Sequence, residues 1–168
     1  MAVGIEERMV PYMEDKKQDR KMIEELKQQY AGPEMSGEQV EQMKKRIGED
    51  GKLIAVIKTD GYGHGAVPLA EMFEETPYIW GYAVACMGEA AVLREQGIKK
   101  PILVLGCIFP DEYEEMVEKE IRAAVYTEEM ALGMSEAAQR LGKTAYFHIK
   151  IDTGMGRIGF PVTEESAS

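Results

Sequence analysis

Apolar runs and helical patterns alternate along this chain from residue 53 onward, and this alternation limits the possible folds more than any other feature. The strand candidates are 53–57, 79–84, 101–105, 122–126 and 145–151, and helical patterns lie between them at about 64–75, 88–96, 111–119 and 128–141. Strands that alternate with helices of this length predict a parallel sheet with right-handed crossovers. We therefore expect an α/β fold with about five parallel strands and flanking helices.

Residues at the helix ends support these boundaries. Pro110 suits the first turn of the third helix, and Thr127 can cap the fourth. Gly97 and Gly142 stand where helices end and a positive φ is favoured. Two architectures fit the pattern. One is a partial (β/α)8 TIM barrel, because a closed barrel needs eight strands and typically about 250 residues. The other is an open, doubly wound five-stranded sheet.

Composition narrows the possible partners. The 168 residues carry 30 acidic against 20 basic side chains, a net charge of −10, so we expect no nucleic-acid partner. No apolar stretch approaches a membrane span, and the N-terminus lacks the apolar core of a signal peptide. Cys86 and Cys107 form no CxxC pair and fit free thiols in a reducing cytosol. The two thiols therefore indicate a cytoplasmic protein. His64 and His148 lack metal-site spacing, so we expect no metal.

Lys58 stands at the end of the first apolar run, which is too short and too β-branched for a helix and predicts a buried strand. The next residues, TDGYGHG, contain three glycines, typical of a tight turn or a close approach to a ligand. Parallel α/β folds place their chemistry at the carboxyl ends of strands. A lysine amine there can pair with a phosphate or form a Schiff base with a carbonyl. A solvated lysine is the alternative.

A second strand, 145–151, also runs into a glycine-rich loop. This loop and the strand end carry Lys150, Asp152 and Arg157. The two segments, AVIKTDGYGHG at 55–65 and HIKIDTGMGRIGF at 148–160, resemble the alanine racemases, which use pyridoxal phosphate on a (β/α)8 barrel. Shorter strings resemble the family too: GYAVA at 81–85, EAAVLREQGI at 89–98 and PILVLG at 101–106. The resemblance covers roughly residues 38 to 165 and favours the barrel.

The resemblance implies an isomerase that interconverts L- and D-alanine and supplies D-alanine for peptidoglycan, with serine left open as a substrate. Lys58 would hold the aldehyde of pyridoxal 5'-phosphate and act as the catalytic base facing the D-enantiomer. Tyr62 would bind the cofactor phosphate, with packing on the barrel rim as the alternative. Arg157 would contact the phenolic oxygen of the cofactor and the substrate carboxylate, which a planar guanidinium suits. Met155 would offer its backbone N–H to the substrate.

Three further residues have supporting roles by resemblance. Lys150 matches a lysine that relatives often carry as a carbamate, and an ion pair with Asp152 is the alternative. His64 orients its neighbours in the loop or makes only a structural hydrogen bond.

The ends of the chain depart from the family. Residues 1–35 are expected to form a polar helical or disordered arm, whereas 36–168 form the racemase-like barrel portion, beginning with a helix at Ser36–Ile47 that is capped by Ser36 and Gln39. The family's three further strands, its C-terminal β-domain and the second base, a tyrosine from the partner subunit of a homodimer, have no match here. We therefore expect an incomplete site. The alternatives are a non-catalytic barrel protein that binds pyridoxal phosphate and an inactive fragment of a truncated gene.

Overall fold

The computed structural model describes residues 45–48 and 50–162. Residues 45–47 are helical, in agreement with the end of the helix expected at 36–47. The start of that helix and the arm expected at 1–35 lie outside the described residues. Residues from Asp50 onward form one structural unit, which contains every element discussed below.

Five parallel strands form the main sheet. They are β1 (Leu53–Val56), β2 (Ile79–Val84), β3 (Ile102–Val104), β4 (Ile121–Val125) and β5 (Phe147–Ile149). Each strand pairs only with its neighbours along the chain, so the order is β1-β2-β3-β4-β5. A doubly wound sheet reverses its strand order at a switch point, whereas a barrel adds each strand beside the previous one. The observed order therefore excludes the open sheet and gives a partial TIM barrel.

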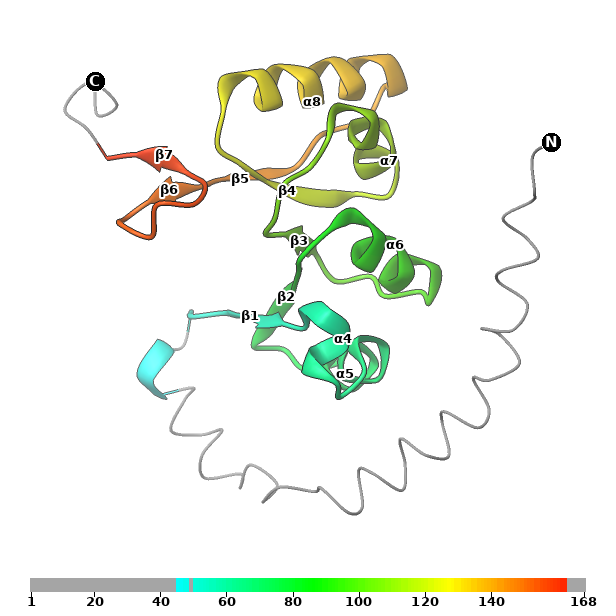
Figure 1. Cartoon of the computed structure of the whole chain (residues 1–168). Helices are drawn as coiled ribbons and strands as arrows, with labels where there is room; N and C mark the ends of the chain where they lie inside the picture. Colours follow the sequence, from blue (N-terminus) through cyan, green and yellow to red (C-terminus); the bar gives the residue numbers. More distant parts are fainter. Residues whose placement is uncertain (1–44, 49, 163–168) are drawn as a thin grey trace. The chain divides into compact units, whose positions relative to one another are not determined.

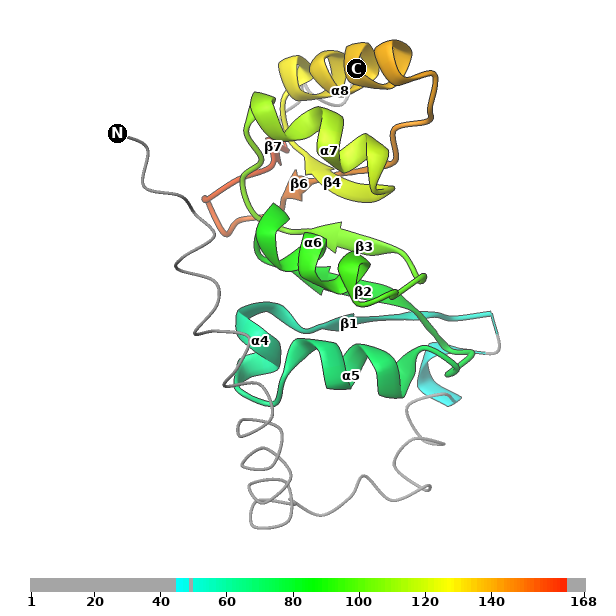
Figure 2. The same ribbon diagram turned by 90° about the vertical axis from the view of Figure 1, so that its right-hand side faces the viewer.

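The helices that connect these strands are α5 (Ala66–Phe73), α6 (Met87–Glu95), the short 3-10 helix η1 (Pro110–Glu112) with α7 (Tyr113–Glu118), and α8 (Glu128–Leu141). They lie along one side of the sheet, in the order of the strands (Figures 1 and 2). The expected caps are present. The Thr127 hydroxyl accepts a hydrogen bond from the Met130 amide at 3.2 Å, and Gly142 ends α8 with φ 61°. Pro110 opens η1, and Gly97 follows α6 with φ 84°.

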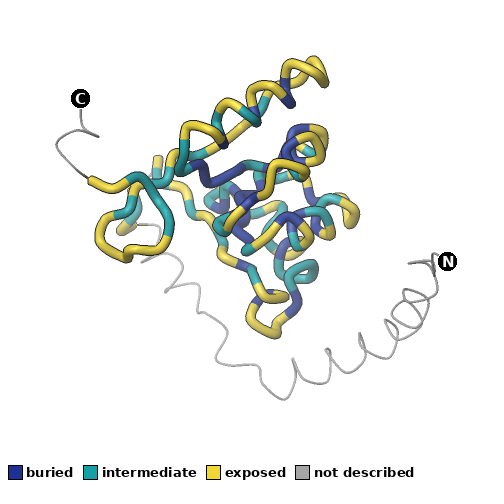
Figure 3. Tube along the Cα trace, turned by 45° about the horizontal axis from the view of Figure 1, so that its top comes forward, coloured by how far each residue is buried: buried dark blue, intermediate teal, exposed yellow. Residues whose placement is uncertain are grey.

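The main core lies between the sheet and its helices (Figure 3). Its fully buried side chains include Tyr82, Leu93, Ile102, Met116, Ile121 and Met134. A smaller cluster of Ala83, Leu103 and Ala124 lies on the inner face of the sheet. The prediction of a buried first strand is wrong for its inward residues: Ile54 and Val56 are 37% and 45% exposed because no further strand covers this face in the described residues.

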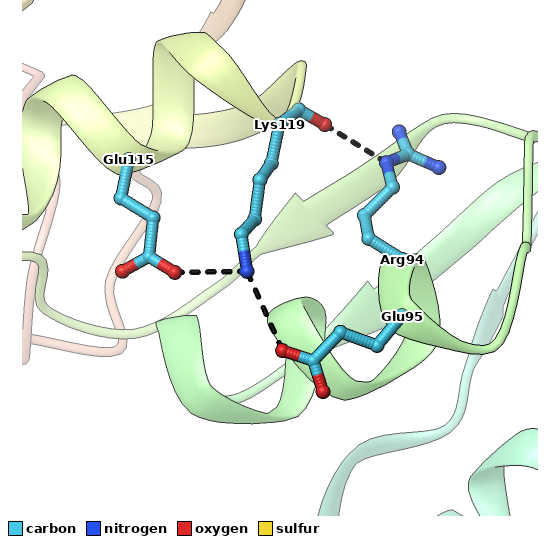
Figure 4. Close-up of polar contacts among 4 residues, drawn as sticks. All are labelled: Arg94, Glu95, Glu115 and Lys119. Atoms are coloured by element: carbon cyan, nitrogen blue, oxygen red, sulfur yellow. Dashed lines mark hydrogen bonds and ion pairs between the residues drawn. The ribbon is translucent and has the colours of Figure 1, made fainter.

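Arg94 connects the amino ends of the strands, far from the loops that carry the candidate site residues. Its guanidinium donates to the carbonyls of Ile98, Lys100, Lys119 and Glu120 at 2.7–3.1 Å. Lys119 also pairs with Glu115 at 3.0 Å and with Glu95 at 3.6 Å, which ties α6 to α7 (Figure 4). The five donors of this guanidinium thus stabilise the amino-end side of the barrel, where residues generally serve stability rather than catalysis.

Candidate active site

A pocket of about 480 Å³ lies at the carboxyl ends of the strands. Segments that follow β1, β2, β3 and β5 form its walls, as do the residues of the last glycine-rich loop. The lining residues are Lys58, Ala85, Leu105, Gly106, Lys150, Ile151, Asp152, Thr153, Met155, Arg157 and Ile158. Lys58 and Arg157 therefore share one pocket at the carboxyl end of the sheet, although they come from its two opposite edges.

The chain makes a left-handed turn directly after Lys58. Thr59, Asp60 and Gly61 have φ values of 55°, 50° and 62°, and α4 (Lys58–Tyr62) is this turn. A helix was expected here only from residue 64, and α5 does begin later, at Ala66. Left-handed backbone costs an L-residue about 1–2 kcal/mol, most of all a β-branched one such as Thr59. The turn therefore persists only because its surroundings hold it.

Local contacts supply part of that support. The Asp60 carboxylate accepts the Ala66 amide at 2.8 Å, which fixes the turn to the start of α5. His64 places its Nδ1 at 3.1 Å from the Gly61 carbonyl, so this nitrogen carries the proton and donates. A Cβ on Gly61 would lie 2.8 Å from Leu69 Cδ1, so only glycine fits there without a shift. His64 thus makes the structural hydrogen bond that the sequence left open for it.

Tyr62 stands apart from the other sequence-derived candidates. Its side chain is 61% exposed, and it is not among the residues that line the pocket. Its backbone φ is 56°, so it completes the left-handed turn. The structure thus brings together Lys58, Lys150, Asp152, Met155 and Arg157, but places Tyr62 and His64 outside the pocket wall.

Asp152 shapes the loop that carries Met155 and Arg157. The expected strand at 145–151 is in fact interrupted, because β6 (Ile151–Asp152) leaves the main sheet and pairs in parallel with β7 (Phe160–Pro161). Between them, the Asp152 carboxylate accepts the Gly154 amide at 2.9 Å and the Gly156 amide at 2.9 and 3.1 Å. These backbone donors, that of Gly156 first, hold the pKa of the Asp152 carboxyl below its ordinary value.

The charges in the pocket are predominantly positive. Lys58, Lys150 and Arg157 line it together with a single carboxylate, that of Asp152. The Lys150–Asp152 ion pair considered from the sequence is not formed, since no oxygen of Asp152 lies within 4.0 Å of the Lys150 amine. Arg157 contacts the Met155 sulfur at 3.0 Å, and both side chains are exposed. In a protein of net charge −10, this cationic pocket suits a ligand that carries phosphate or carboxylate groups.

The Asp152 contacts predict a pH dependence of loop order. A carboxyl whose pKa falls on folding stabilises the folded loop above its ordinary pKa of 3.8, and this contribution disappears as the pH drops through the lower folded value. We expect the Gly156 amide resonance to titrate with a midpoint below 3.8 in an NMR pH series. The Asp152→Asn variant serves as the control and should show no such titration. A midpoint above the ordinary value would contradict the geometry.

Several lining residues were not singled out from the sequence. Ala85 directly follows β2, and Leu105 and Gly106 directly follow β3. The rule that selected Lys58, proximity to the carboxyl end of a strand, could have found them. Their side chains carry no reactive or charged group, so the sequence did not indicate them as site residues.

Comparison with known proteins shows similarity to alanine racemases over most of this chain. The family model for the N-terminal domain of alanine racemase matches residues 37–168. The alanine racemase of Desulforamulus reducens is 41% identical over 126 residues, which are 75% of this chain and 34% of that protein. Alanine racemase 2 of Oceanobacillus iheyensis is 44% identical over 125 residues, 73% of this chain and 31% of that protein. The chain thus spans about a third of the length of these relatives.

Solved structures agree with the fold. The alanine racemase of Clostridium difficile 630 superposes with a TM-score of 0.71 at 42% identity, covering 76% of this chain and 33% of that one. A histidine racemase from Leuconostoc mesenteroides gives a TM-score of 0.61 at 30% identity, covering 70% and 31%. In the described part of the chain, no helix has the length and apolar character needed to cross a membrane, and no three metal-ligating side chains gather.

Proposed function

This chain belongs to the alanine racemase family through its N-terminal domain, and we propose that the protein interconverts L- and D-alanine with pyridoxal 5'-phosphate. The observation that carries the proposal is the shared pocket of Lys58 and Arg157. An amine and a guanidinium at the carboxyl end of a barrel are the groups needed to hold an aldehyde and a carboxylate side by side. Alanine is the proposed substrate because the relatives at 41–44% identity are alanine racemases.

The pocket fits the cofactor in size and charge. A volume of about 480 Å³ lies within the usual range for small-ligand sites. Its three cationic side chains suit a phosphate and a carboxylate, which an acidic pocket would repel. Lys58 would hold the aldehyde carbon and Arg157 the phenolic oxygen. Tyr62 is exposed and does not line the pocket, so its side chain would have to turn toward the pocket for its hydroxyl to bind the phosphate. When bound, pyridoxal phosphate withdraws electrons from the substrate Cα and makes its proton removable.

The residues of this chain then have separate tasks. Lys58 holds and returns a proton at its Nζ, on the face of the D-enantiomer. Arg157 orients the substrate carboxylate, and the Met155 amide offers one further donor. Asp152 stabilises the loop that carries Met155 and Arg157 by accepting hydrogen bonds from the Gly154 and Gly156 amides.

The opposite face of the substrate requires a second proton donor. In our proposal the complete protein is a homodimer, and a tyrosine of the partner subunit fills this role. The product is consumed in the cytoplasm as D-alanine for peptidoglycan. These statements rest on the family to which the chain belongs.

Reductive trapping tests the assignment of Lys58. When the protein is mixed with pyridoxal phosphate and reduced with borohydride, peptide mapping should find the label on Lys58. Lys58→Arg keeps the charge but cannot react with an aldehyde, so its labelling should fall to background. Lys52→Arg, at the exposed residue before β1, is the matched control and should label as the parent does. Label spread evenly over surface lysines would remove the site assignment.

A further inference from the structure

Glu89 joins the two chain segments that form the Lys58 side of the pocket. It lies in the first turn of α6, and its two carboxylate oxygens accept hydrogen bonds from different parts of the chain. Oε2 accepts the Ala85 amide at 2.7 Å, and Oε1 accepts the Thr59 amide at 2.7 Å. Ala85 and Lys58 both line the pocket. The carboxylate thus connects the residue after Lys58 to the end of β2.

The hydrogen bond from the Thr59 amide to Glu89 lies at a residue with an unfavourable backbone conformation. The ladder between β1 and β2 extends to Ile57, whose amide donates to the Ala83 carbonyl at 2.9 Å. Thr59 then enters the left-handed region with φ 55° and ψ 49°, which is unfavourable for a β-branched residue. A charge-assisted hydrogen bond is about twice as strong as a neutral one, so it can offset this conformational cost.

From this geometry, and resting on the proposed function, we infer that Glu89 is a positioning residue for Lys58. It holds the left-handed turn in place through Thr59 and thereby fixes the point from which the Lys58 amine enters the pocket. Glu89 does not line the pocket and touches none of the reacting groups. Its effect passes through the backbone of Thr59.

A comparison with Glu112 distinguishes the positioning role of Glu89 from ordinary helix capping. Glu112 Oε2 accepts the Phe109 amide at 2.8 Å, three residues earlier in the chain, so it caps the start of η1 locally. Glu89 makes a comparable local bond to Ala85, but adds the bond to Thr59 across 30 residues. Glu112→Gln therefore removes a capping charge without disturbing the Lys58 turn, and is the matched control for Glu89→Gln.

Hydrogen exchange of the cofactor-free chain tests the contact directly. Glutamine at position 89 keeps one acceptor oxygen and presents an NH₂ group to the other amide, so one of the two bonds is lost. We expect the local Ala85 bond to remain and exchange of the Thr59 amide to accelerate roughly tenfold or more in Glu89→Gln. In Glu112→Gln, exchange at Thr59 should equal that of the parent. A Thr59 amide that stays protected in Glu89→Gln overturns the inference.

Reductive labelling tests the consequence for Lys58. In Glu89→Gln, borohydride labelling of Lys58 relative to Lys52 should fall roughly tenfold. Adding Thr59→Gly should restore it, because glycine adopts a positive φ without the cost that Glu89 offsets. A general loss of stability would not be rescued in this way, and thermal unfolding of all variants measures that loss separately.

The outcomes are distinct. Loss of labelling in Glu89→Gln together with rescue by Thr59→Gly supports the inference. Parent-like labelling in Glu89→Gln, or an equal loss in Glu112→Gln, overturns it. A different result separates the inference from the proposed function: Lys58 of the parent is not labelled, but exchange of the Thr59 amide still depends on Glu89. In that case the proposed function is wrong, whereas the stabilisation of the turn by Glu89 is confirmed.

Discussion

Replacing Gly81 with alanine is expected to destabilise the β/α unit by about 3 kcal/mol or more, a large part of the stability of an ordinary domain. Gly81 is buried in β2, and a Cβ there would lie 2.3 Å from the Pro101 carbonyl oxygen. That oxygen cannot withdraw easily, since it accepts the Tyr82 amide at 2.8 Å in the sheet. The added methyl group must therefore push β2 and β3 apart.

Urea denaturation followed by circular dichroism measures this effect. Gly88→Ala is the matched control, because Gly88 is exposed in α6 and a Cβ there meets nothing within 4 Å. Gly88 is the second residue of α6, so its replacement by alanine should stabilise the protein by less than the roughly 0.5–1 kcal/mol of a helix-interior site. The two variants thus add the same methyl group with opposite expected signs. Equal midpoints for Gly81→Ala and the parent would show that the strands are spaced differently from this structure.

The elements that sequence patterns located best are those with local boundary signals. The α8 helix spans Glu128–Leu141 as predicted, because Thr127 and Gly142 mark its two ends chemically. The β2 strand also has its predicted bounds, Ile79–Val84. A local pattern could not determine the order of the strands, since alternating strands and helices fit both an open sheet and a barrel. Strand order depends on pairing between distant segments.

The same reasoning explains what was missed at the site. Lys58, Lys150, Asp152, Met155 and Arg157 were found because their strings have an unusual composition, and they do meet in one pocket. The sequence pattern predicts a loop after Lys58 and a helix from residue 64, and does not predict the left-handed turn. This turn depends on a contact between Thr59 and Glu89, which are 30 residues apart in the chain. Glu89 itself lay within a recognised string, but its role becomes visible only when β1 and β2 are side by side.

A polypeptide of these 168 residues is expected not to racemise alanine at a useful rate. Racemisation requires proton transfer on both faces of Cα, and the pocket offers Lys58 as the base on one of them. In our proposal a tyrosine of the partner subunit is the donor on the other face, and none of the described residues that line the pocket is a tyrosine. Loss of one acid–base group typically removes about 10²–10⁴-fold of the rate.

A coupled assay of D-alanine formation on the purified polypeptide tests this expectation, with L-serine and L-histidine assayed in parallel. Lys58→Ala, purified in the same way, controls for racemase from the expression host. Among the described residues, the outer edges of β1 and β5 pair with no further strand, and such edges should make the polypeptide prone to self-association because they recruit other strands. Size-exclusion chromatography therefore accompanies the assay. Turnover close to that of a full-length relative, lost in Lys58→Ala, would mean that association of the chains supplies the missing donor, and the one-sided pocket would not describe the active species.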